Sequence, residues 1–587
     1  MLALASAAAC HKDTIVTTRT VTAFVPASCA VDGGGYATYV ALGDFEPGQV
    51  QPGPFLKDVG TVLPQIDTQA RELVVTASEN DRQWAGAAPV PSAGDVNVLL
   101  MPQAQSCRLT GPAGARTEST FAPIGSRLAM LAGGTFNPTP ATYVVNLDTG
   151  AVSAANPDLH TPRAEGASVT AFGDGGLVAG GLHSSGDPTD EAEVYSPSAG
   201  GFTTLFHLSE PRSLHAAVVL ADGRTLLVGG TGVVGGPPWI SFMEIVDPAT
   251  NAGHEENVAQ LDPVVTSPVA VRLASGEILV AGQTMAGAAN FTALQWFTPD
   301  ARLSSKRTQL IGPGVVTLAP LAAGGALAVV DADPKIDTWV IDASGVVEPA
   351  TPTGAPLASP RLFAGGGGAP VLWTGRTWLR WQPYAARFEL LSTLDATPPA
   401  VSVAACSPEP GLAMWLDVGA QQIAGMRFDT RNAFSALAKG GAVDLATDTA
   451  PDRIATSGAI ALDEGTGLLT LSAPGASVFV TDRTYADVSI TMTLPTSQPP
   501  LVVLRDELGA ELAVGSSDAC PGLLAAKSVT SLDVERRGTT VTWSVNGGAA
   551  TPCTTALADG ARVSVGLRAG STQAVARDLF VKRAGEP

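Results

Sequence analysis

Residues 212–248 read RSLHAAVVLADGRTLLVGGTGVVGGPPWISFMEIVDP. The segment holds two short apolar runs, AAVVL and TLLVGG, separated by the turn-forming pair Asp222-Gly223, and a third run, MEIVDP, that follows a loop. Short apolar runs bounded by Gly, Pro and Asp are typical of antiparallel strands joined by tight turns. The segment therefore predicts three consecutive strands, of which the second ends at Gly229-Gly230.

The same order of strands recurs on both sides of this segment. Upstream, EGASVTAFGDGGLVAGG leads to AEVYSP, and downstream, VVTSPVAVRLASGEILVAG leads to LQWFTP. A weaker copy comes first, and two degraded copies follow through TWVIDASG and RTWLRWQP. The final glycines of four copies are 47, 49 and 52 residues apart, at Gly134, Gly181, Gly230 and Gly282. A period near 50 residues made of short strands is typical of radially repeated four-stranded sheets.

These units resemble the kelch-repeat family of β-propellers. Gly180-Gly181 and Gly229-Gly230 match the double glycine of that family, and Tyr195 and Trp296 match its downstream aromatic residue. Ala281 departs from the pattern by replacing the first glycine of the fourth unit. The resemblance implies an all-β fold with a propeller of six or seven blades over residues 36–395, in which the N-terminal segment supplies a blade or part of one. The glycines are expected to allow neighbouring blades to pack closely.

The repeat disappears after a proline-bearing linker at 396–407. Residues 408–587 contain alternating runs such as ADVSITMTL and TTVTWSVNGG, which predict a sandwich of short strands. Their order is similar to that of concanavalin A-like and laminin-G-like jelly rolls. Asn546-Gly547 is expected to form a hairpin turn, because both positions of that turn require positive φ.

The N-terminus, MLALASAAAC, is apolar and ends in small residues before Cys10. It resembles a truncated bacterial lipoprotein signal over residues 1–10, followed by a linker at 11–35. The resemblance implies lipidation of Cys10 and a location in the cell envelope or outside the cell, anchored by lipid to the outer membrane surface. The alternatives are an ordinary apolar N-terminus and a cleaved secretory signal without lipid. Residues 310–330 also carry no charge, but their prolines and glycines favour two buried strands over a membrane span.

Composition limits the kinds of partner. The chain of 587 residues has 34 Lys+Arg against 54 Asp+Glu, a net charge of -20, so a nucleic-acid partner is not expected. Hydrophobic residues make up 45% and charged residues 15%, a composition that can bury a large core.

The cysteines are not spaced as metal ligands, and two disulfides in an oxidising compartment are the better interpretation. Cys520 is expected to pair with Cys553 and Cys29 with Cys107, while Cys406 is left over. The odd count leaves three interpretations open: a free buried thiol, a different pairing, or disulfides that do not form.

The candidate chemistries are weak. Copper-binding kelch-type oxidases use a Tyr–Cys crosslink, and this chain has no cysteine between 107 and 406. The acidic pairs Asp463-Glu464 and Asp506-Glu507 could serve a glycosidase but are expected at solvated turns. A calcium site in the acidic loop at 184–193 is likewise less favoured than a solvated loop. His215 is expected to be structural. No cofactor and no metal site are predicted.

The favoured hypothesis is a surface-anchored binding or adhesion lipoprotein that recognises a carbohydrate or a protein. Trp84 and Trp239 lie in loop-like stretches and are the candidate ligand-binding residues, because an indole ring can stack on a sugar or a partner. The alternatives are a carbohydrate-active enzyme with its site in the propeller mouth and a purely structural envelope protein.

Overall fold

The expected all-β class is confirmed. Apart from the short 3-10 turn η1 (Ala27–Cys29), the regular elements of the described residues are strands, and no helix among them is long and apolar enough to cross a membrane. The computed structural model describes residues 16–29, 36–43, 51–54, 60–67, 70–79, 82–102, 105–114, 116, 119–125, 127–134, 140–164, 167–233, 238–254, 258–284, 291–306, 308–321, 323–332, 335–351, 360–363, 370–374, 377–382, 385–390, 404–409, 411–428, 443–444, 454–463, 468–480, 485, 487–494, 499–515, 519–520 and 530–583.

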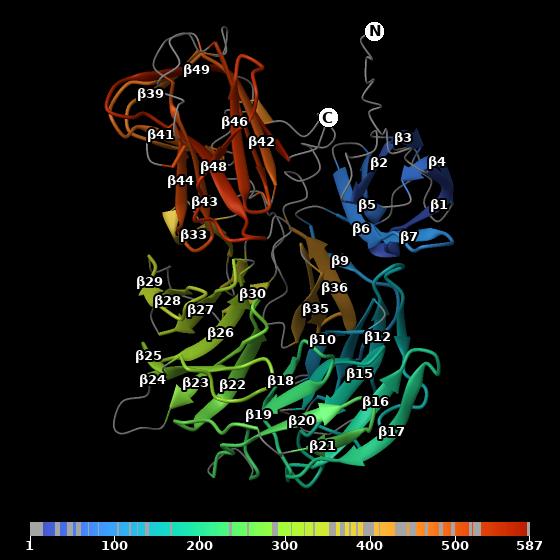
Figure 1. Cartoon of the computed structure of the whole chain (residues 1–587). Helices are drawn as coiled ribbons and strands as arrows, with labels where there is room; N and C mark the ends of the chain where they lie inside the picture. The colour runs from blue at the N-terminus through green and yellow to red at the C-terminus, as the bar shows by residue number, and fades with distance from the viewer. Residues whose placement is uncertain are drawn as a thin grey trace, which may run out of the picture.

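The middle of the chain forms seven four-stranded antiparallel sheets, which occupy the lower part of the molecule in Figure 1. In the first six, the strands follow chain order from one edge to the other. Their strands are β10 (Thr120–Ile124), β11 (Leu128–Ala132), β12 (Tyr143–Asn146) and β13 (Val152–Ala154); β14 (Ser168–Phe172), β15 (Gly175–Ala179), β16 (Glu191–Ser196) and β17 (Gly201–His207); β18 (Ala216–Val219), β19 (Thr225–Val228), β20 (Met243–Asp247) and β21 (Ala252–His254); β22 (Val265–Arg272), β23 (Ile278–Thr284), β24 (Phe291–Phe297) and β25 (Gln309–Ile311); β26 (Val315–Pro320), β27 (Ala326–Asp331), β28 (Ile336–Ile341) and β29 (Val347–Pro349); β30 (Arg361–Phe363), β31 (Val371–Trp373), β32 (Trp378–Gln382) and β33 (Arg387–Leu390).

The seventh sheet joins distant parts of the chain. Its strands β34 (Ala405–Glu409), β35 (Leu412–Asp417) and β36 (Gln422–Arg427) are consecutive, but its fourth strand is β9 (Cys107–Arg108), where Gly425 pairs with Cys107. The first strands of neighbouring sheets lie against one another from β10 to β30, and β10 also contacts β34. The first sheet therefore packs against both the second and the seventh.

The glycine pairs adopt the backbone that the sequence predicts. Gly180 and Gly181 have φ of 59° and 97°, and a Cβ added to Gly180 would lie 2.3 Å from the carbonyl oxygen of Arg212, in the next unit. Such a contact is shorter than a carbon atom tolerates, so the close approach of neighbouring sheets requires glycine here.

The N-terminal segment supplies part of one four-stranded sheet, the strand β9, and not a whole sheet of the repeat; both possibilities were open from the sequence. The other N-terminal strands form two sheets of their own, with the order β4-β1-β7 and β3-β2-β5-β6-β8, which share one apolar core. This pair of sheets is called the N-terminal sandwich. Among the described N-terminal strands, only β9 pairs with a strand of the repeat, whereas Leu99 and Met101 of the strands before it pack in an apolar cluster with the first and seventh sheets. The strands are β1 (Val16–Phe24), β2 (Tyr36–Gly43), β3 (Gln51–Pro54), β4 (Thr61–Asp67), β5 (Ala70–Glu79), β6 (Arg82–Pro89), β7 (Val96–Leu99) and β8 (Met101–Pro102).

The C-terminal strands form an eight-stranded and a five-stranded antiparallel sheet around a second large core. This pair of sheets is called the C-terminal sandwich, or the C-terminal domain. The expected boundary at 408 is too early, since β34 to β36 complete the seventh sheet and β37 is the first strand of the C-terminal pair. The strands are β37 (Val443–Asp444), β38 (Ile454–Ser457), β39 (Ile460–Asp463), β40 (Leu468–Leu471), β41 (Ser477–Val480), β42 (Val488–Thr493), β43 (Leu501–Asp506), β44 (Glu511–Val514), β45 (Ser531–Arg537), β46 (Thr540–Val545), β47 (Thr551–Cys553), β48 (Val563–Arg568) and β49 (Ala574–Arg583).

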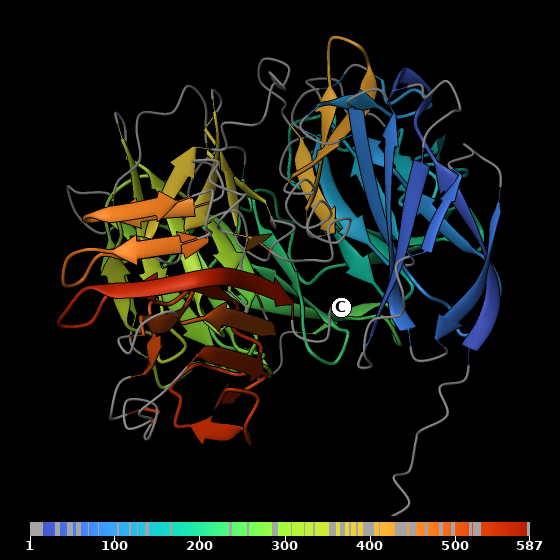
Figure 2. The ribbon, with the colours of Figure 1, turned by 90° about the horizontal axis from the view of Figure 1, so that it is seen from above.

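The N-terminal and C-terminal sheet pairs are separate from each other. In Figures 1 and 2, the blue N-terminal strands and the red C-terminal strands lie on opposite sides of the molecule.

The turn at Asn546-Gly547 between β46 and β47 has φ of 53° and 67°, as expected. Residues 310–330 contain the strands β26 and β27, which confirms that interpretation of the uncharged segment.

Gly180→Ala is expected to destabilise the chain by clearly more than Gly200→Ala. Both glycines have positive φ, which costs a non-glycine residue about 1 kcal/mol, but the space around Gly200 is open whereas Gly180 faces the Arg212 carbonyl. Urea unfolding of both variants measures the difference in the free energy of unfolding. Equal losses would show that the close approach of the sheets at Gly180 is easily relaxed.

Candidate functional site

Three buried arginines begin the first three repeat units. Arg116, Arg163 and Arg212 each donate a hydrogen bond from Nη1 to the carbonyl of the first glycine of their own unit, at 2.9, 3.1 and 3.4 Å respectively. All three side chains are almost fully buried. Because an unpaired buried carbonyl is costly, each guanidinium stabilises the sharp turn that the glycine pair makes.

Buried carboxylates on the third strands neutralise two of these arginines. Glu193 accepts from Arg163 Nη2 at 2.7 Å, and Glu244 accepts from Arg212 Nη2 at 2.9 Å. The same carboxylates accept backbone N–H groups of the preceding connection, from His160 to Glu193 at 2.6 Å and from Ser209 to Glu244 at 2.8 Å. Each pair thus ties the connection, the glycine turn and the third strand together.

The fourth unit shows what replaces the pair. Val264 and Val265 stand where an arginine would, and the carboxylate position is taken by the neutral Gln295. Gln295 still accepts the N–H of Asp262 at 2.8 Å and donates to the carbonyl of Pro263 at 2.9 Å. In the fourth unit the acid is therefore lost together with the buried cation, as expected if an unpaired buried charge is costly.

The first unit has an arginine without a buried carboxylate. The Arg116 guanidinium lies 4.9 Å from the centre of the Tyr143 ring and also donates to the Ala141 carbonyl at 2.7 Å. Burial lowers the pKa of Arg116, while Tyr143 and Asp158 act in the opposite direction. An aromatic face and carbonyl oxygens thus take the place of a counter-ion.

His215 lies between the second and third sheets and is structural, as expected. Its Nε2 lies 2.8 Å from Ser168 Oγ, and the side chain is buried. Burial, and then the positive charges of Arg212 and Arg163, lower its pKa to about 3. The imidazole is therefore neutral at physiological pH and acts as a hydrogen-bonding link between two sheets.

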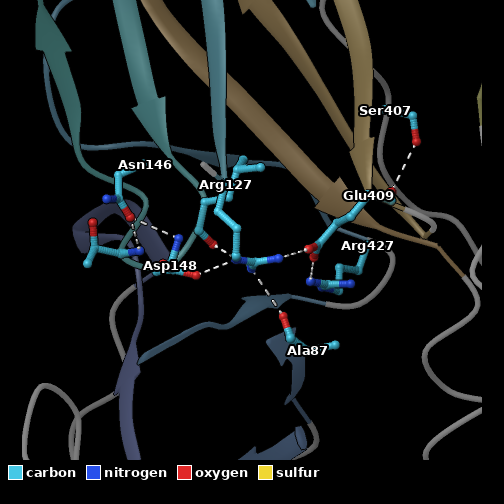
Figure 3. Close-up of polar contacts among 9 residues, drawn as sticks. Ala87, Arg127, Asn146, Asp148, Ser407, Glu409 and Arg427 are labelled. Carbon is cyan, nitrogen blue, oxygen red and sulfur yellow. Dashed lines mark hydrogen bonds and ion pairs between the residues drawn. The ribbon is translucent and has the colours of Figure 1, made fainter. Parts of the chain in front are cut away.

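Arg127 joins three parts of the molecule. Figure 3 shows its guanidinium between Asp148 of the first sheet, Glu409 of the seventh sheet and the carbonyl of Ala87 in the N-terminal sandwich, at 2.5, 3.1 and 3.4 Å. Glu409 also pairs with Arg427. Although burial acts against it, Glu409 and Asp148 raise the pKa of Arg127. The cluster fixes the first and seventh sheets and the N-terminal sandwich to one another.

The two candidate tryptophans lie in different surroundings. Trp84 is 2% exposed in the N-terminal core, so it is not available to a ligand. The sequence could not show this, because the strand β6 that carries Trp84 lacks an obvious alternating pattern. Trp239 is partly exposed and lies on the connection between β19 and β20, where it forms an isolated bridge with Thr231. The other two partly exposed tryptophans, Trp339 and Trp373, lie on strands and pack against apolar cores.

The cysteines pair as expected. Disulfides join Cys29 to Cys107 and Cys520 to Cys553, and Cys406 is a buried free thiol whose pKa burial raises. Two disulfides fit an oxidising compartment outside the cytoplasm. The bond between Cys29 and Cys107 attaches β9, and with it the seventh sheet, to the N-terminal sandwich. Cys10 lies outside the described residues.

Several acidic residues differ from their expected surroundings. Glu193, which we placed in a solvated loop, is buried against Arg163, whereas Asp187 of the same loop is exposed. Asp506 and Glu507 are also buried, not solvated, because their turn is covered by the fifth sheet. The side chains of Asp463 and Glu464 lie outside the described residues. Within the described part of the chain, no group of three His, Cys, Asp or Glu residues is placed to hold a metal ion.

The main feature that sequence reasoning missed is the arginine that begins each of the first three repeat units. Arg116, Arg163 and Arg212 are spaced by 47 and 49 residues, which is the spacing of the glycine pairs, so the periodicity contained the signal. Nothing local indicated Arg127, and nothing local showed that Glu507 of the acidic pair Asp506-Glu507 is buried, because the partners of both residues are distant in sequence.

Comparisons with known proteins leave the family open. No protein-family model matches the chain, and no curated protein matches it.

Arg212→Met is expected to destabilise the chain by about 3–5 kcal/mol, because it leaves the Glu244 carboxylate buried without its cation. The double variant Arg212→Val, Glu244→Gln copies the fourth unit and is expected to recover a large part of that loss. Urea unfolding measures both. Arg302→Met, in an exposed pair with Asp300, serves as the control and should cost less than about 1 kcal/mol. A double variant as unstable as the single one would contradict this explanation.

Arg127→Ala is expected to cost about 1.5–3 kcal/mol, the range for hydrogen bonds to charged groups. It should also speed amide exchange in β6, since the Ala87 carbonyl loses a donor. Hydrogen exchange and urea unfolding check both effects against Arg387→Ala, whose pair with Glu389 is local and exposed. If the two variants behave alike, Arg127 does not join the three parts.

Proposed function

We propose that the chain is a surface-anchored binding or adhesion lipoprotein that recognises a carbohydrate or a protein partner. In this proposal the seven four-stranded sheets form a kelch-like propeller that β9 completes, and the two C-terminal sheets form a concanavalin A-like jelly roll. The glycine pairs, the chain-ordered strands and the contacts between first strands support the propeller. Cys10 is the proposed lipid attachment site, which would hold the protein at the outer membrane surface.

The observation that carries the binding proposal is the placement of Trp239. An indole ring partly exposed on a connection offers a large, rigid apolar surface at little cost in side-chain entropy. Phe242 lies three residues further along the same connection and is itself held against Arg212, whose guanidinium lies 5.1 Å from its ring centre. The connection is thus anchored at one end by the buried Arg212–Glu244 pair, which favours a preformed surface over one that orders on binding.

Carbohydrate is the ligand class we test first. Sugars present C–H faces that stack on indole rings, and Trp239 offers a partly exposed ring of this kind. The chain from residue 11 onward, screened on a glycan array with and without calcium, should give saturable binding without release of reducing sugar. Release of reducing sugar would instead establish a carbohydrate-active enzyme, and absence of binding to any glycan would refute carbohydrate recognition.

Trp239→Ala is expected to weaken binding to the strongest glycan at least tenfold, which corresponds to about 1.4 kcal/mol. Val233→Ala removes apolar surface from an exposed residue of the same connection and serves as the matched control. Isothermal titration calorimetry measures both affinities, and unfolding curves verify that the variants are folded. Equal affinities of the two variants would move the binding surface away from this connection.

A further inference from the structure

One turn of the C-terminal sandwich contacts the fifth sheet. This turn, residues 506–510, connects β43 and β44 and reaches the hairpin turn 321–325 between β26 and β27. Leu508 packs against an apolar cluster of the fifth and sixth sheets, and its side chain would lie 2.9 Å from a Cβ added to Gly325. The glycine therefore makes room for the leucine of the other domain.

Glu507 lies at the centre of this contact. Its Oε1 accepts the backbone N–H of Ala323 in the fifth sheet at 2.9 Å, and its Oε2 accepts the N–H of Arg562 in its own domain at 2.8 Å. The residue is 4% exposed. One carboxylate thus bridges the two domains through both oxygens, and both of its hydrogen-bond donors are backbone N–H groups.

The surrounding charges are few. Within the turn, Asp506 is also buried and is held by its own backbone, since Oδ1 accepts the N–H of Leu508 and of Ala510. Arg562 and Arg536 supply positive charge from the C-terminal domain. The facing turn 321–325 has the sequence LAAGG and contributes no titratable group. The fifth sheet therefore removes water from Glu507 without providing a counter-ion.

We propose that this turn is a pH-dependent latch, in which proton uptake by Glu507 strengthens the attachment of the C-terminal domain to the fifth sheet. Separation of the domains would return water to the carboxylate and remove the Ala323 donor. The protonated side chain can still accept the Ala323 N–H through its carbonyl oxygen, so protonation removes the cost of a buried charge without removing the bridge.

The direction of the pH effect follows from the protonation equilibrium. Burial raises the pKa of Glu507 to about 6 from its ordinary value of 4.5, despite the opposing hydrogen bonds from Ala323 and Arg562. A carboxyl whose pKa is higher in the attached state stabilises attachment fully below pH 4.5 and loses that contribution as pH rises through 6. The shift corresponds to a change of about 30-fold in the attachment equilibrium between the two limits.

The test uses the full chain with dyes on Ala274→Cys and Gly570→Cys, two exposed positions in the fourth sheet and the C-terminal domain. Energy transfer between the dyes is followed in urea at pH values from 4.5 to 8, and the urea midpoint reports the attachment. The midpoint should fall as pH rises from 5 to 7. If separation and unfolding coincide, the midpoint reports the same proton linkage, since Glu507 is buried only while the contact persists.

Two variants separate Glu507 from other carboxyl groups. Glu507→Gln keeps an oxygen acceptor for Ala323 but cannot titrate, so its midpoint should lose the pH-dependent fall between 5 and 7. Glu511 lies on the next strand, β44, and pairs with Arg568 of β48. The Glu511→Gln variant should keep the pH-dependent fall of the urea midpoint that the parent chain shows. A parent chain whose midpoint does not fall over this range, or a Glu507→Gln variant that falls equally, would overturn the proposal.

Discussion

The repeated sheets depend on one constraint, the need to satisfy backbone carbonyls where neighbouring sheets approach most closely. Glycine pairs allow the approach, but they leave carbonyl groups at a sharp turn that no strand can pair. The buried guanidiniums of Arg116, Arg163 and Arg212 supply the donors. A buried cation in turn requires compensation, which explains the carboxylates Glu193 and Glu244 and the stacked Tyr143 ring.

Both apolar packing and a small number of specific polar contacts join the cores of the molecule. The N-terminal sandwich is attached to the repeat by an apolar cluster that includes Leu99 and Met101, by the Cys29–Cys107 disulfide and by Arg127. The C-terminal sandwich is attached to the fifth sheet through Glu507 and Leu508. Because these contacts involve few residues, single substitutions there can change how domains are joined without disturbing the cores themselves.

The proposed binding surface and the repeat share the same structural support. Arg212 begins the third unit, pairs with Glu244 and holds Phe242, which lies on the connection that carries Trp239. A ligand at Trp239 would therefore rest on a connection fixed by a buried ion pair. In this proposal the partly exposed Trp239 contacts the ligand, whereas the buried Arg212–Glu244 pair stabilises the unit that carries it.

The sequence by itself determined what local pattern and spacing control. The period near 50 residues and the turns at Asp222-Gly223 and Asn546-Gly547 follow from residues whose backbone permits few alternatives, whereas the sequence left the pairing of the cysteines open and the structure decided it. Only the tertiary structure decided which sheet each strand joins, as β9 shows by pairing with β36 more than 300 residues away. It also decided that Trp84 and Glu507 are buried and that Trp239 is partly exposed. Burial depends on which distant element covers a side chain, and no local pattern specifies that element.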